Sequence, residues 1–244
     1  YPPPEWDVVL SLPAVQATAL VFVDYALYGA STPTSWPRDV AQRVPEDVES
    51  DWRLLRPIIA HGTVWRDFVL FRIGPDDVAQ RDWDAFREWA ASLTDAEMRD
   101  LVVEGVVSGL RYYREMMKPM PAVEELLAPL GMRAPDRSAL ADDDALRAAV
   151  AALVASWQAP VEPVVELGFD FSRVRHTLLR MLDAVWDGGF GEAWTANLPR
   201  LRRAVVAATR RLEEAAGVWG SSGSGGAAPA GLSELVLKAT GRQL

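Results

Sequence analysis

The chain has 244 residues, half of them hydrophobic, which excludes intrinsic disorder over most of its length. Its formal net charge of −9 disfavours strong binding to nucleic acid, because an acidic surface repels phosphate groups. It has no cysteine and no apolar run near about 18 residues, so we exclude disulfides, thiolate metal sites and a membrane span and expect a cytoplasmic protein.

Apolar residues follow a helical period along nearly the whole chain. The helices that we expect cover about residues 15–28, 45–60, 75–91, 95–117, 122–130, 145–158, 174–186 and 199–216, with a Pro/Ser/Thr-rich loop at 29–37. Residues 64–73 are compatible with a strand or a buried helix, and we favour a helix. The sequence therefore predicts an all-α fold, an irregular multi-helix bundle of about nine or ten helices.

Three of these helices begin with a recognisable capping signal. Thr94 and Glu97 have the spacing of a capping box. Asn197, shortly before Pro199, is the expected cap of the last long helix. The three aspartates at 142–144 either cap the Ala-rich helix that follows or bind a hard cation through their oxygens. We favour capping, because acids stabilise the positive end of a helix.

The composition changes abruptly near the end of the chain. Residues 1–219 are expected to form one all-α regulatory or dimerisation domain, which can be subdivided near residue 131. Residues 220–231 are rich in Gly and Ser, which is typical of a flexible linker. Residues 232–244 are expected to form a short amphipathic helix that leads to a further domain beyond this chain.

No signature of catalysis or of metal binding is present in the sequence. Neither lysine stands in a phosphate-binding loop, and no Gly-x-Ser-x-Gly elbow occurs. The two histidines, His61 and His176, lack a second ligand at a metal-binding helical spacing, so a structural role is favoured for both. We therefore predict no catalytic residue, no metal ligand and no cofactor, although distant residues can assemble a site that no motif reveals.

Tryptophan is abundant, with 10 residues. Such side chains either fill the space between helices or line a pocket for an apolar or cationic ligand, and their spacing does not separate these alternatives. Trp83, Phe86 and Trp89 recur every three residues and should share one helix face. For a pocket that binds a small apolar or aromatic ligand, the candidate residues are the aromatic Trp65, Phe68, Trp83 and Trp186 and the polar Arg111 and Tyr112.

One pattern resembles a known family. The segment 185–194 reads VWDGGFGEAW and is followed by LPRL at 198–201 and, after the Gly/Ser-rich stretch, by TGR at 240–242. This order is similar to the helical N-terminal region of bacterial ArsR-like winged-helix transcriptional regulators. The resemblance is confined to about residues 185–244, and the winged helix itself is absent from this chain, so no DNA-binding residue is assigned.

The resemblance implies that this chain is the ligand-sensing or dimerisation region of a transcriptional regulator. It also implies a homodimer, which would contact DNA only through a domain absent here. The alternative is a free-standing helical protein that binds a small molecule or another protein. An enzyme whose site carries no motif is a third hypothesis.

Overall fold

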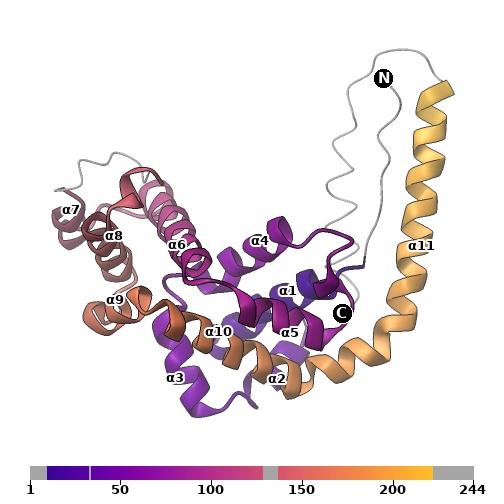
Figure 1. Cartoon of the computed structure of the whole chain (residues 1–244), viewed down its shortest axis with the longest axis horizontal. Helices are drawn as coiled ribbons and strands as arrows, with labels where there is room; N and C mark the ends of the chain where they lie inside the picture. The colour runs from indigo at the N-terminus through magenta and orange to yellow at the C-terminus, as the bar shows by residue number, and fades with distance from the viewer. Residues whose placement is uncertain (1–9, 33, 129–136, 222–244) are drawn as a thin grey trace. The chain divides into compact units, whose positions relative to one another are not determined.

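The computed structural model describes residues 10–32, 34–128 and 137–221, and every regular element in these ranges is helical (Figure 1). The α-helices are α1 (Leu12–Leu27), α2 (Trp36–Ala41), α3 (Glu46–Leu55), α4 (Thr63–Arg72), α5 (Trp83–Ser92), α6 (Asp95–Met116), α7 (Pro121–Leu127), α8 (Asp143–Ser156), α9 (Val161–Phe169), α10 (Phe171–Val185) and α11 (Gly191–Ser221). A π-helical turn, Trp186–Phe190, lies between α10 and α11. The predicted all-α multi-helix fold is confirmed.

Several local predictions are also confirmed. The segment that could have been a strand is the helix α4. Both hydrogen bonds of the capping box form at the start of α6, between Thr94 and Glu97. The carboxylate of Asp142 accepts hydrogen bonds from the backbone N–H groups of residues 144 and 145, so this acid caps α8, as its position before an Ala-rich helix indicated.

Other helix boundaries differ from the prediction. The helix expected from residue 75 begins only at Trp83, because Asp82 accepts from the backbone N–H of Ala85 and makes a new N-cap there. Asn197 is not a cap: it lies inside α11, and its side-chain amide donates to the carbonyl of Ala193 one turn earlier. The short helices α2 and α9 were not expected from the sequence.

The described residues belong to two units, which we describe separately. One unit is Ser11–Gly191, called the body below, and the other contains Leu10 and the part of α11 from Glu192 onward. The predicted subdivision near residue 131 and the predicted terminal helix at 232–244 fall outside the described residues, as does the predicted linker except for its first two residues, which belong to α11.

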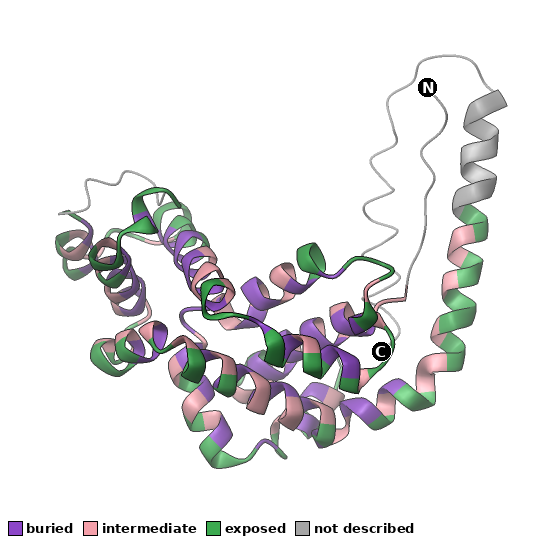
Figure 2. Ribbon diagram, viewed as in Figure 1, coloured by how far each residue is buried: buried purple, intermediate pink, exposed green. Residues whose placement is uncertain are grey.

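Two helices organise the core of the body. α1 is buried around most of its circumference, as a helix that is apolar on nearly all sides requires (Figure 2). α10 contacts α1, α3, α5, α6 and α9, and its buried residues repeat at intervals of three and four from Val174 to Val185. These two helices place α4 and α6, whose facing surfaces form the groove described below.

The packing of α6 requires a glycine at one point. A Cβ atom added at Gly105 would lie 1.8 Å from the backbone carbonyl oxygen of Ile58. The segment after α3 can therefore approach α6 this closely only because residue 105 has no side chain.

We predict that Gly105→Ala lowers the free energy of unfolding by about 3 kcal/mol or more, because the clash is with backbone that cannot rotate away. The matched control is Gly74→Ala, since a Cβ atom there meets nothing within 4 Å, and this change should stay within about 0.5 kcal/mol. Urea unfolding of the two variants measures both values. Equal stabilities would contradict the close approach.

Candidate functional site

A groove of about 420 Å³ lies on the body between α4 and α6. Its lining residues occupy one face of each helix, together with one residue that follows α7: Val64, Asp67, Phe68, Phe71 and Arg72 of α4, Asp100, Glu104, Val107, Ser108 and Arg111 of α6, and Arg137. The lining residues of each helix are spaced three and four residues apart, so they lie on one face of that helix and form one wall of the groove. A groove of this volume is in the range that small molecules occupy.

One part of the groove contains a network of charges that neutralise each other. Asp100 Oδ2 lies 3.4 Å from Arg72 Nη2, and Asp100 Oδ1 lies 2.9 Å from Arg137 Nη2. Arg137 also pairs with Glu104. Two arginines and two acids therefore satisfy one another, which leaves little net charge there for a ligand to compensate.

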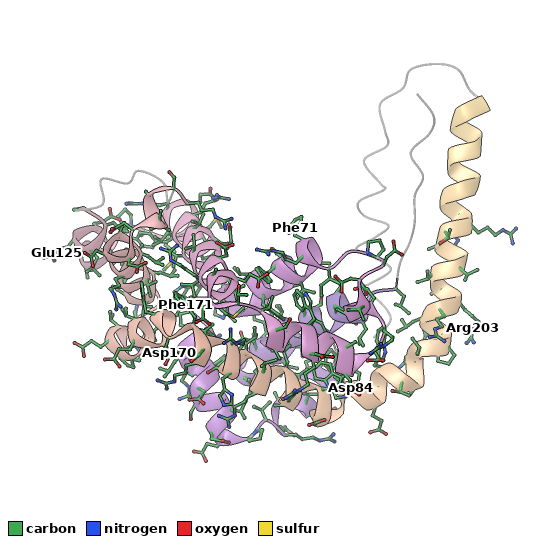
Figure 3. All side chains as sticks on the ribbon, viewed as in Figure 1. Phe71, Asp84, Glu125, Asp170, Phe171 and Arg203 are labelled. Carbon is green, nitrogen blue, oxygen red and sulfur yellow. The ribbon has the colours of Figure 1, made fainter. Side chains whose placement is uncertain are left out.

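The apolar part of the groove is built around two phenylalanines of α4. The ring of Phe68 is stacked on Trp65, with centroids 5.9 Å apart and planes at 19°. Phe71 is 90% exposed and projects from the end of α4 (Figure 3). In the groove, the exposed ring of Phe71 and part of the half-buried ring of Phe68 are open to solvent, whereas Val64 and Val107, which also line it, are buried.

Arg111 differs from the other two arginines of the groove, because it forms no ion pair within the described structure. Its side chain is exposed, and in the described residues no ion pair involves it. The neighbouring acid Asp67 is already paired with Arg66, at 2.7 Å. Ser108 lies one turn before Arg111 on the same face and adds a hydroxyl group. Arg111 and Ser108 are therefore two hydrogen-bond donors that line this part of the groove.

The residues that the sequence singled out as ligand contacts are only partly brought together. Phe68 and Arg111 both line the groove. Tyr112 stacks on Trp157 instead, with ring planes at 7°. The other three belong to a continuous set of contacting rings in the body, called the aromatic cluster here, which consists of Trp36, Trp65, Phe68, Trp83, Phe86, Trp89, Trp186 and Phe190.

The rings of the aromatic cluster pack against one another. Trp83 and Trp186 stack face to face, with centroids 4.5 Å apart and planes at 4°. Trp65 is fully buried. The predicted common face of Trp83, Phe86 and Trp89 is confirmed, since the ring of Phe86 contacts both of the others. Three of the eight rings, including Trp65 and Phe86, are buried and the other five are half-buried, and Phe68 is the ring of the cluster that lines the groove.

A second polar feature of the body was not predicted from the sequence. Asp24 of α1 is completely buried, and its carboxylate accepts hydrogen bonds from Trp52 Nε1 at 2.8 Å and from Arg56 Nε at 3.1 Å. His61 Nδ1 lies 3.2 Å from the other carboxylate oxygen. The guanidinium carbon of Arg56 sits 3.4 Å from the centroid of the Tyr28 ring. We call these five residues the polar cluster.

The backbone beside the polar cluster is strained. Ala60, His61 and Gly62 have φ values of 46°, 59° and 83°, and only the glycine adopts such values without steric cost. Consecutive left-handed residues persist only where the surroundings hold them. Here the ring of His61 is held by Asp24 on one side and, at 4.9 Å between centroids, by the edge contact with Trp157 on the other.

The polar cluster has little free hydrogen-bonding capacity, because its groups already contact one another. His61 Nδ1 lies 2.6 Å from Arg56 Nη2 as well as near Asp24, so this nitrogen is occupied whichever tautomer is present. His176, the other histidine, is exposed on α10. Within the described ranges, no group of three or more His, Asp or Glu side chains is placed to hold a metal ion.

The ionisation of Asp24 reflects two opposing effects. Burial alone would raise the pKa of its carboxyl group. The hydrogen bonds from His61, Arg56 and Trp52 and the charge of Arg56 outweigh burial and lower the pKa below its ordinary value of 3.8. Asp24 is thus a buried carboxylate that is kept charged by its partners.

Comparison of the chain with protein-family models, with curated proteins and with solved structures gives no match. No helix in the described ranges combines the length and the apolarity needed to cross a membrane. The assignment of a function therefore depends on the groove and on the polar cluster themselves.

We predict that Asp24→Asn lowers the free energy of unfolding by about 2–4 kcal/mol, because it leaves the charge of Arg56 without its buried partner. The control is Glu49→Gln, which removes the exposed pair with Arg53 and should cost less than about 1 kcal/mol. Urea unfolding at neutral pH compares the two. Similar losses would show that Asp24 contributes no more than a surface ion pair.

The stability lost in Asp24→Asn should depend on pH. A carboxyl group whose pKa is lowered by folding stabilises the fold above its unfolded pKa, and this contribution is lost as the pH falls through the folded pKa. The stability difference between the native chain and Asp24→Asn should therefore shrink as the pH falls below 3.8. Urea unfolding of both chains across this range measures the difference, and a difference that stays constant would contradict the lowered pKa of Asp24.

Proposed function

We propose that the body is a small-molecule-binding domain whose ligand occupies the groove between α4 and α6. The observation that carries this proposal is the exposed ring of Phe71 in a groove that is also lined by Arg111, a cation that has no ion pair in the described structure. Large exposed aromatic side chains in a concave site are typical of ligand-binding surfaces.

The chemistry of the lining favours an amphipathic anion. An apolar chain or ring would cover Phe71 and the exposed part of Phe68, and burying apolar area stabilises the complex by about 25 cal/mol per Å². A carboxylate at the other end of the molecule would accept charge-assisted hydrogen bonds from Arg111. The arginines at the opposite part of the groove are already paired with Asp100 and Glu104, so they compete weakly for that carboxylate.

The biological role that we propose for this binding is effector sensing in a transcriptional regulator. Its support is the sequence order at 185–201 and 240–242, which resembles ArsR-like regulators. In that case the groove receives the effector, and DNA is contacted by a domain outside this chain. The acidic character of the chain agrees with this division of roles, because its net charge of −9 opposes direct contact with phosphates.

We predict that octanoate binds the full chain and that Phe71→Ala weakens its binding about fivefold, because part of the apolar wall is lost. The matched control is Leu70→Ala, which removes a neighbouring side chain that is 52% exposed but does not line the groove. Isothermal titration calorimetry measures the affinities. Equal effects of the two substitutions would place the ligand elsewhere.

The charge requirement is tested with the same probe. Arg111→Gln should weaken octanoate about fivefold and leave 1-octanol unchanged, because only the carboxylate uses the guanidinium group. Arg38→Gln, which removes an exposed arginine of α2 and changes the net charge equally, is the control. If neither probe binds, the proposed function is wrong, and if both bind equally to every variant, the anion preference is wrong.

A further inference from the structure

The last described helix carries an apolar seam along its length. α11 has 31 residues, whereas helices of globular proteins average about 11–12. Along it, apolar side chains recur at alternating intervals of three and four residues, at Leu198, Leu201, Val205 and Ala208, and the sequence continues this alternation at Leu212 and Ala215. This alternation is the a/d heptad pattern, in which one helix face packs against another helix of the same kind.

We propose that this seam, defined by residues 198, 201, 205, 208, 212 and 215, is the surface through which two copies of the chain pair as a parallel coiled coil. The four seam residues up to Ala208 are half-buried, so each is partly covered within the chain and keeps the rest of its surface for a partner. The seam spans about 25 Å at a rise of 1.5 Å per residue.

A second copy of the chain is the occupant that the pattern favours. Knobs-into-holes packing requires a partner helix with the same heptad spacing over a similar length, and a second α11 brings both.

The charges beside the seam are compatible with the parallel orientation. If Leu198 and Val205 are a positions, Arg202 stands at an e position and Arg211 at a g position. In a parallel pair a g residue faces the following e residue of the partner helix, so Arg211 would face Ala216 of the second copy and Asn197 would face its Arg202. Parallel pairing therefore brings no two arginines together across the seam.

The chain offers a direct test because it has no cysteine of its own. In a parallel, in-register pair, both Leu198→Cys and Val205→Cys place two thiols opposite each other, at the Cα separation of about 5.5–6 Å that a disulfide requires. We expect both variants to form a covalent dimer under mild oxidation at micromolar concentration. The control is Val206→Cys, next to the seam and 70% exposed, which should remain uncrosslinked.

Sedimentation of the full chain completes the test. The native chain and Val206→Asp should sediment as dimers, whereas Val205→Asp should dissociate at least tenfold more readily. A native chain that remains monomeric at every concentration would overturn the proposal, as would equal crosslinking at 205 and 206. Crosslinking at only one of the positions 198 and 205 would overturn the parallel arrangement, since an antiparallel pair can bring at most one of them opposite itself.

Discussion

One buried carboxylate connects α1, α3 and the turn before α4, and the position of the groove depends on these elements. Asp24 in α1 accepts hydrogen bonds from Trp52 in α3 and from Arg56 at its end, and it contacts His61 in the turn that leads into α4. A charge at this depth is costly unless every partner is present. The strained turn at residues 60–62 directly precedes Thr63, so the same contacts that satisfy Asp24 also set where α4 starts. The start of α4 in turn determines the position of Phe68 and Phe71, which lie on this helix and line the groove.

Much of the fold could be predicted from local patterns because helices are stabilised by neighbours along the chain. The capping box at Thr94 and the cap at Asp142 involve residues two or three positions apart, and both form as expected. Asn197 failed as a predicted cap because a short polar side chain can donate to the preceding turn as readily as it can accept at a helix start. Its role therefore depends on whether the helix already exists before it.

The candidate site was less predictable, because its contacts join distant positions. The partners of Asp24 lie 28 to 37 residues away, and nothing near Asp24 in the sequence indicates which donors will meet it. The one indication in the sequence was that Asp24 is the single charged residue of a largely apolar helix, since a charge buried there needs a partner. Among the aromatic residues, spacing indicated a shared face for Trp83 and Phe86. It could not show that this face would be closed by Trp186, about 100 residues later.

The aromatic cluster also connects the groove, through a continuous series of ring contacts, to the π-helical turn that follows α10. Phe68 lines the groove, and ring contacts pass from it through Trp65, Phe86 and Trp83 to the π-helical turn that contains Trp186. Packed contact alone does not couple two regions, because coupling requires an element with two discrete arrangements. The π-helical turn is the element on this route that departs from regular α-helix geometry, with Gly189 at a φ of 126°. This turn, which joins α10 to α11, is therefore the element of the route in which we would look for a second arrangement.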